Sequence, residues 1–154
     1  MSGKLKFLLS FLIFLWIAGF MIEFVIPYFG FGAFLFPFLK NFYGNVCHQQ
    51  PEKTIAISSH SMLVCARCGG IYFGAFLSSL IILVAKFQKS LPTKYFFIAG
   101  VPMLADVLLY SFGVYSYSKT VAFLTGLLLG SAAFLYFYDA LLILFREKEK
   151  KEVK

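Results

Sequence analysis

The sequence predicts an all-α membrane protein, a bundle of about four transmembrane helices with a Cys/His-rich loop at one membrane face. Of the 154 residues, 60% are hydrophobic and 21 are phenylalanine, whereas soluble domains are roughly 45–50% apolar. The mean hydropathy is +0.83. All three cysteines and both histidines fall within residues 47–68. These observations predict one compact membrane domain with a single chemically distinctive segment.

Four apolar stretches are long enough to cross a membrane, because a helix needs about 20 mostly apolar residues to span a hydrocarbon core of roughly 30 Å. The first covers residues 7–27 and follows a basic flank. Its apolar stretch exceeds the roughly 7–15 residues of a signal-peptide core, which favours an uncleaved helix. The other spans are expected at residues 69–85, 95–113 and 120–145.

Two further segments complete a single predicted transmembrane domain of residues 1–145. Residues 28–40 are rich in Phe and Gly, contain Pro37 and are too short to cross, so we expect an interfacial or re-entrant segment. Residues 41–68 are the long polar stretch that carries the cysteines, and we expect them to form a loop. Residues 146–154 form a basic tail, which is expected to be cytoplasmic.

The basic residues predict the orientation of the bundle. The predicted spans place ten of the 14 Lys and Arg on the side of both termini and four on the other, namely Lys40, Lys53, Arg67 and Lys119. Because basic loops stay in the cytoplasm, we expect both termini there and the Cys/His loop in the periplasm or outside the cell. The formal net charge of +7 is expected to face lipid headgroups rather than nucleic acid.

The Cys/His loop has the composition of a metal site. Cys65 and Cys68 form a C-x-x-C pair that opens a predicted helix, where two thiolates converge on one ion and the helix N-terminus favours the thiolate form. We expect Cys47 and His60 to complete a tetrahedral site of three cysteines and one histidine, with His48 as an alternative ligand or a supporting group. Zinc suits these ligands, and Cu(I) is the alternative because soft thiolates also bind it.

Two other interpretations of the cysteines stay open. A disulfide from Cys47 to Cys65 or Cys68 would tie the loop to the second span, although an odd number of cysteines leaves one thiol over. A redox-active C-x-x-C pair is the other interpretation, but no thioredoxin-like alternation of strands and helices surrounds it.

The residues around the cysteines resemble the DUF2085 family of small predicted integral membrane proteins. The resemblance rests on the run CHQQPE at residues 47–52 and on the run HSMLVCARCGGIYFG at residues 60–74. The later helices carry a weaker similarity, a proline, an aspartate and a T-G-x-x-x-G step, at Pro102, Asp106, Thr125, Gly126 and Gly130. The chain departs from the family pattern at Val107, where glycine is frequent, and at Lys119. The resemblance implies the helical membrane topology and the cysteine site.

Charged residues near or within the spans are further candidates. Asp106 lies 11 residues into the third predicted span, where a carboxylate must be protonated or paired, and its expected partner is Arg67 or a donor such as Thr125. This pairing has either a functional or a purely structural role. Glu23 lies near the outward end of the first span, where it either reaches water or supports the Cys/His site. Glu52 follows the first cysteine and is a candidate beside it.

Small residues predict how the helices pack and what they contact. The steps Gly70-x-x-x-Gly74 and Gly126-x-x-x-Gly130 allow backbones to approach closely, so we expect the second and fourth spans to touch, or two copies of the chain to dimerise through these faces. The expected partners are therefore the lipid bilayer and either a homo-oligomer or a larger membrane complex.

Three functions fit these residues. The first is a metal-binding membrane protein whose outward Cys/His site stabilises the loop or senses and hands on a metal ion. The second is a membrane-embedded metal-dependent enzyme that acts on a lipid or isoprenoid headgroup. The sequence has no H-E-x-x-H motif and no paired-Asp or serine-nucleophile motif, so whether it is an enzyme stays open. The third is a disulfide-stapled assembly subunit without turnover.

Overall fold

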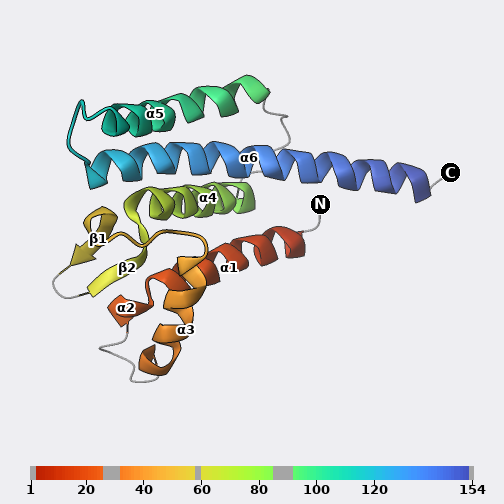
Figure 1. Ribbon diagram of the computed structural model, residues 1–154. Helices are drawn as coiled ribbons and strands as arrows, with labels where there is room; N and C mark the ends of the chain where they lie inside the picture. Colours follow the sequence, from red (N-terminus) through yellow and green to blue (C-terminus); the bar gives the residue numbers. More distant parts are fainter. Residues whose placement is uncertain (1–2, 26–31, 58–59, 85–91, 153–154) are drawn as a thin grey trace.

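The computed structural model describes residues 3–25, 32–57, 60–84 and 92–152. Within these residues, four helices are long and apolar enough to cross a membrane. They are α1 (Gly3–Phe20), α4 (Ala66–Val84), α5 (Thr93–Ser111) and the first 26 residues of α6 (Lys119–Glu152). These helices confirm the predicted fold class, an all-α membrane bundle (Figure 1).

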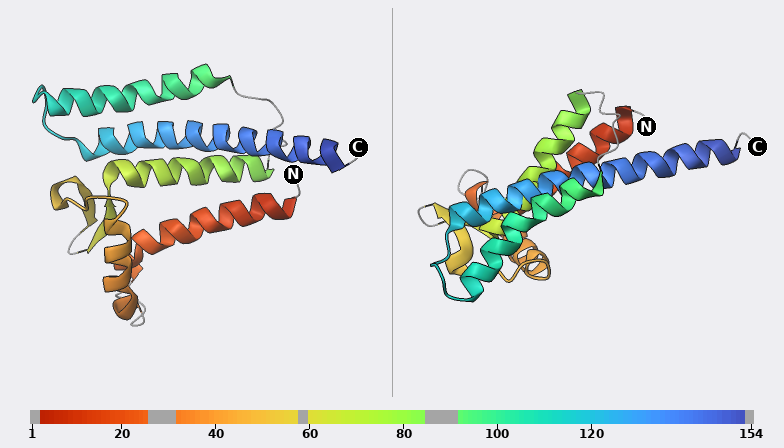
Figure 2. Two further views of the ribbon diagram at one scale, coloured as in Figure 1. Left: turned by 45° about the vertical axis from the view of Figure 1, so that its right-hand side comes forward. Right: turned by 90° about the horizontal axis from the view of Figure 1, so that it is seen from above.

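The long helices lie side by side in the order α1, α4, α6 and α5 (Figures 1 and 2), since α4 contacts α1 and α6, and α6 contacts α5. The start of α1 and the end of α6 lie at one end of this row (Figure 1). The connection between α5 and α6 lies at the opposite end. Large apolar side chains such as Phe11, Phe97 and Leu104 are exposed on the outer faces, which hydrocarbon accepts as readily as a protein core does.

Short elements gather at the end of the row that carries the connection between α5 and α6 (Figure 1). They are α2 (Ile22–Val25), α3 (Gly32–Gly44), the 3-10 turn η1 (Pro51–Lys53), β1 (Thr54–Ile57) and β2 (His60–Cys65). β2 leads directly into α4.

The two strands form an antiparallel hairpin inside the stretch that was expected to be a loop. Thr54 pairs with Cys65 at one end, and Ile57 pairs with His60 at the other. The segment is rich in β-branched and apolar residues, which favour strands, and Met62, Leu63 and Val64 are all buried. Burial of this apolar run against the helices stabilises the hairpin and positions Cys65 at the start of α4.

The helix ends differ from the expected spans by a few residues. Met21 breaks the first helix between α1 and α2, and the expected end of that span, residues 26 and 27, lies outside the described residues. The expected interfacial segment is helical from Gly32 onward and contains Pro37, while residues 28–31 are not described. α4 begins at Ala66, so Cys68 is inside its first turn, and α6 continues as helix to Glu152.

A buried core joins α1, α3 and β2 at the hairpin end of the bundle. Its members are Ile17, Phe20, Tyr43, Cys47, Met62, Leu63 and Val64. The Tyr43 hydroxyl donates to the Trp16 carbonyl at 2.7 Å and ties α3 to α1. One of the cysteines, Cys47, is therefore held inside packed apolar side chains.

α4 and α6 pack through the predicted glycine steps. A Cβ atom at Gly70 would overlap the Phe123 carbonyl, and one at Gly130 would overlap the Ile71 carbonyl. The Ser131 hydroxyl donates to the Gly74 carbonyl at 3.2 Å across the same contact. The prediction that the second and fourth spans touch is confirmed by these contacts and by the extensive packing of α4 on α6.

Candidate metal centre

Three cysteines converge at the end of the bundle that carries the hairpin. Cys47 follows α3, Cys65 is the last residue of β2 and Cys68 lies in the first turn of α4. Their three Sγ atoms lie within 4.8 Å of one another. All three are free thiols, Cys47 buried and the other two half-buried. In the described part of the chain, no other group of Cys, His, Asp and Glu side chains is close enough to hold a metal ion.

Local backbone geometry brings the thiols together. The chain turns back after α3, where the Cys47 N–H donates to the Tyr43 carbonyl at 2.9 Å. The junction of β2 and α4 then places Cys65 and Cys68 on the two sides of a strand-to-helix turn. The Cys65 N–H donates to Cys47 Sγ at 3.2 Å. This hydrogen bond joins the segment after α3 to the end of β2.

Hydrogen bonds favour the thiolate form of Cys47. The Cys65 side chain and then the Cys68 side chain contribute most to holding the pKa of the Cys47 thiol well below its ordinary value, while burial opposes them. The backbone at Gln49 and Cys65 adds to the lowering. The lowered pKa of Cys47 favours the thiolate, which is the form of cysteine that binds metal ions.

A cavity of about 350 Å³ opens beside the sulfur atoms. The three cysteines line it together with Val46, His48, Gln49, Gln50 and Lys53. None of these lining residues is acidic. Lys53 therefore provides a fixed positive charge in the cavity that the thiols face.

Of the two histidines, His48 lies beside the thiols and His60 does not. His60 pairs with Ile57 at the turn end of the hairpin, five residues before Cys65, which is roughly 16 Å along a strand that rises about 3.3 Å per residue. The structure does not bring His60 to the cysteines, because the hairpin holds it at the far end of β2. His48 follows Cys47 directly, has an exposed side chain and lines the cavity.

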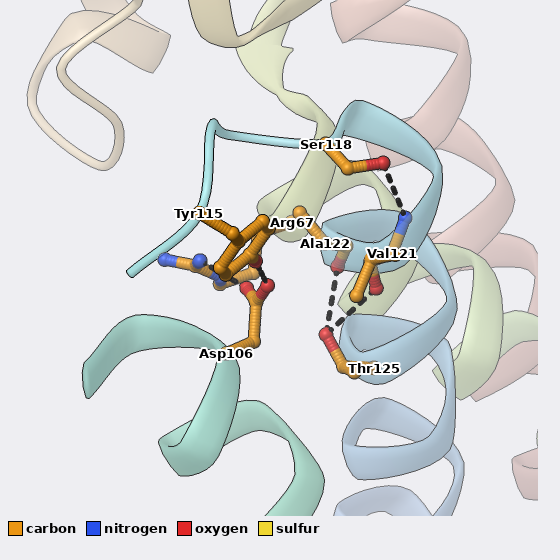
Figure 3. Close-up of polar contacts among 7 residues, drawn as sticks. All are labelled: Arg67, Asp106, Tyr115, Ser118, Val121, Ala122 and Thr125. Carbon is orange, nitrogen blue, oxygen red and sulfur yellow. Dashed lines mark hydrogen bonds and ion pairs between the residues drawn. The ribbon is translucent and has the colours of Figure 1, made fainter. Parts of the chain in front are cut away.

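Arg67, which lies between the cysteines of the C-x-x-C pair, points toward α5 (Figure 3). Its guanidinium forms an ion pair with Asp106 at 2.5 Å. The Tyr115 hydroxyl donates to the other oxygen of the Asp106 carboxylate, whose side chain is 2% exposed. Both oxygens thus have partners, as burial of a charge requires.

Thr125 takes no part in this network, although it was an expected partner of Asp106. Its hydroxyl donates to the carbonyls of its own helix, at 2.9 Å to Val121 and 3.2 Å to Ala122 (Figure 3). Of the two partners that the sequence left open, the structure selects Arg67.

A cluster of cationic and aromatic side chains links the cavity to this ion pair. The Lys53 ammonium lies 4.9 Å from the centre of the Tyr110 ring and 5.8 Å from that of Tyr117. Arg67 Cζ lies 5.9 Å from the Tyr117 ring, and burial raises the pKa of Tyr117 to about 12. Sequence reasoning missed this cluster, because tyrosines at a helix end indicate only a membrane-interface anchor.

The two glutamates that the sequence marked as candidates, Glu23 and Glu52, lie away from the thiols. The Glu23 carboxylate accepts hydrogen bonds from the backbone N–H and the hydroxyl of Ser61 at 2.9 and 3.0 Å. Glu23 therefore fastens α2 to β2 and supports the hairpin. Glu52 is exposed in η1 and does not belong to the thiol cluster.

The four apolar helices and the thiol cluster define a small helical membrane protein with a cysteine centre at one end of its bundle. The chain belongs to the DUF2085 family, described as predicted membrane proteins, which it matches over residues 47–136. This match confirms the resemblance seen in the sequence. It begins at Cys47 and includes the other two cysteines, Arg67 and Asp106.

Two archaeal relatives extend the comparison. An uncharacterized protein of Methanocaldococcus jannaschii is 33% identical over 139 residues, which cover 84% of this chain and 86% of the relative. An uncharacterized protein of Methanothermobacter thermautotrophicus is 52% identical over 31 residues, which cover 20% of this chain and 28% of the relative. No solved structure matches the chain.

Proposed function

We propose that the protein binds a thiophilic metal ion, with zinc as the first choice, through the thiolates of Cys47, Cys65 and Cys68. The observation that carries the proposal is the convergence of three Sγ atoms within 4.8 Å from three separate segments. Zinc bonded to sulfur at about 2.3 Å in a tetrahedron needs sulfur atoms about 3.8 Å apart, so shifts of about 1 Å suffice. Cu(I) prefers the same ligands and is the other ion that suits the cluster.

His48 is the fourth ligand in this proposal, in place of His60. It adjoins Cys47, its side chain is exposed and it lines the cavity beside the thiols. Zinc with three thiolates and a neutral imidazole carries one net negative charge. Lys53, which lines the same cavity, supplies the opposite charge nearby, and this charge favours the metal-bound site.

The open cavity supports exchange of the ion with the surroundings. Two of the cysteines are half-buried, and the thiols and the exposed His48 line a cavity of about 350 Å³. Release of His48 toward this cavity would open one coordination position, as exchange of the ion requires. We therefore favour a protein that senses or hands on a metal ion at its membrane face. While bound, the ion also joins α3, the hairpin and α4.

Metal content is the direct test of this function. Protein purified from membranes under reducing conditions is expected to hold about one metal ion per chain by elemental mass spectrometry, and Cys65→Ser and Cys68→Ser are expected to lose nearly all of it. Removing the histidine ligand by His48→Ala is expected to lower the affinity at least about tenfold. His60→Ala is the matched control and is expected to bind as the native protein does.

A disulfide is the competing outcome, because Sγ atoms within 4.8 Å also suit oxidation. A metal-free chain whose intact mass shows an intramolecular disulfide, even after preparation under reducing conditions, would contradict metal binding. That result would favour the disulfide-stapled assembly subunit.

The side of the membrane is tested by thiol labelling in intact cells. The chain has three cysteines, all in the cluster, so an impermeant maleimide reports on this site alone. After chelation and reduction, we expect labelling without lysis, because basic residues concentrate on the opposite side. As a control, a chain with all three cysteines replaced by serine and with Lys154→Cys is expected to label only after lysis. The reverse pattern would place the cluster in the cytoplasm.

A further inference from the structure

Gln49 has an unusual backbone conformation beside the thiol cluster. Its φ angle is 48°, and in the described part of the chain it is the one residue other than glycine with a positive φ. This left-handed region is uncommon for residues that carry a Cβ atom. A residue held there costs about 1–3 kcal/mol, and such residues are frequent at binding sites, where the surrounding structure enforces the conformation.

The neighbours of Gln49 fix this conformation. Pro51 restricts the residue before it to extended backbone, and Gln50 has φ and ψ angles of −64° and 123°. A left-handed turn between Cys47 and η1 therefore does not fall on Gln50. The Gln49 side-chain amide donates to the Lys40 carbonyl of α3 at 2.9 Å, which fastens the turn to that helix.

The left-handed turn bears directly on the sulfur of Cys47. Gln49 lines the thiol cavity, and its backbone N–H is close enough to Cys47 to help lower the pKa of that thiol. The Cys65 N–H donates to the same sulfur at 3.2 Å. Two backbone N–H groups from separate segments therefore favour negative charge on Cys47, and hydrogen bonds to a charged acceptor are about twice as strong as those between neutral groups.

We propose that Gln49 is a positioning residue of the metal site, whose left-handed backbone directs its N–H to Cys47 Sγ and so orients this sulfur toward the ion. The inference rests on the proposed binding of a metal ion. Zinc with three thiolates and one imidazole carries a net negative charge, part of which N–H groups at sulfur offset. Groups that orient a metal ligand in this way account for about 10–100-fold in affinity.

Two valine variants test this role as a matched pair. Gln49→Val removes the left-handed turn, because a residue branched at Cβ strongly disfavours positive φ, and we expect zinc to bind at least about tenfold more weakly. Gln50→Val changes the same residue type at the same cavity, where the extended backbone suits valine. We expect its zinc affinity to be unchanged. Competition with a chromophoric chelator in detergent measures both affinities.

Gln49→Gly separates the backbone turn from the side-chain amide. Glycine adopts positive φ without steric cost, so the N–H keeps its direction although the hydrogen bond to Lys40 is lost. We expect a zinc affinity between those of the native protein and Gln49→Val. Circular dichroism is expected to show the same helix content in every variant, which distinguishes weaker binding from unfolding.

NMR supplies a readout that a merely structural role of Gln49 would not produce. In protein loaded with an NMR-active cadmium isotope, we expect the amide protons of Gln49 and Cys65 to show scalar coupling to the ion across their hydrogen bonds to sulfur. Gln49→Gly is expected to keep the coupling at position 49, and Gln49→Val to lose it. If Gln49→Val does not fold, the native protein and Gln49→Gly decide the question.

The outcomes separate this inference from the proposed function. A native protein that binds no metal ion would overturn both. Metal binding without coupling at Gln49, or with equal affinity in Gln49→Val and Gln50→Val, would overturn the role of Gln49 alone and leave metal binding by the three cysteines in place.

Discussion

Gly130→Ala is expected to lower the free energy of unfolding by about 1–3 kcal/mol. The added Cβ would overlap the backbone carbonyl of Ile71 on α4, and a backbone atom cannot rotate away as a side chain can. Helix propensity predicts the opposite sign, since alanine is better than glycine by about 1 kcal/mol in a helix interior. A destabilised variant would thus show that close contact between α4 and α6 outweighs propensity.

Gly100→Ala on α5 is the matched control for this change. A Cβ there would meet only Leu129 Cδ1 at 3.9 Å, an ordinary contact. We expect this variant to be unchanged or stabilised by up to about 1 kcal/mol. Thermal unfolding in detergent, followed by circular dichroism, compares the two. If the unfolding temperatures of both variants change in the same direction by the same amount, the glycine contact does not hold α4 and α6 together.

Asp106→Ala is expected to destabilise the protein by about 3–5 kcal/mol, because it leaves the Arg67 guanidinium partly buried without its partner. Asp106 is the buried residue of α5, and its carboxylate joins that helix to the start of α4 through the 2.5 Å ion pair. Removing the carboxylate should therefore weaken the packing of α5 before that of the other helices. Limited proteolysis of the connection between α5 and α6, together with thermal unfolding, measures this effect.

A double variant separates the ion pair from the general cost of mutation at these positions. Arg67→Met combined with Asp106→Leu replaces both charges with apolar side chains of similar size, and such replacements are often neutral or stabilising. We expect the double variant to recover most of the stability lost in Asp106→Ala. The single variants Arg67→Met and Asp106→Leu complete the comparison. If the double variant loses as much stability as the two single variants lose together, the two charges do not depend on each other.

The glycine contact between α4 and α6 and the ion pair of Arg67 with Asp106 also support the cysteine cluster. Cys68 and Arg67 occupy the first turn of α4, which is held by the glycine contact with α6 and by the ion pair with α5. The hairpin, fastened by Glu23 through Ser61, holds Cys65 on the other side. Weakening either support is therefore expected to loosen the thiols as well as the bundle.

The sequence by itself determined the class of the protein and the chemistry of its candidate site. The length and apolarity of a span are local properties, so four helices were predictable without any knowledge of their packing. The grouping of every cysteine within residues 47–68 was equally visible. The glycine steps also predicted close packing of helices from a local pattern, but they left open whether α4 meets α6 or a second copy of the chain.

Only the tertiary structure decided which side chains meet. The hairpin was hidden in a segment that is polar overall, because its pairing depends on a second strand and on burial against α1, α2 and α3. That pairing keeps His60 at the far end of β2 and leaves His48 beside the thiols. The choice of Arg67 over Thr125 for Asp106 likewise depended on where α4, α5 and α6 lie. Contacts between distant segments depend on packing geometry, which residue spacing along the chain does not encode.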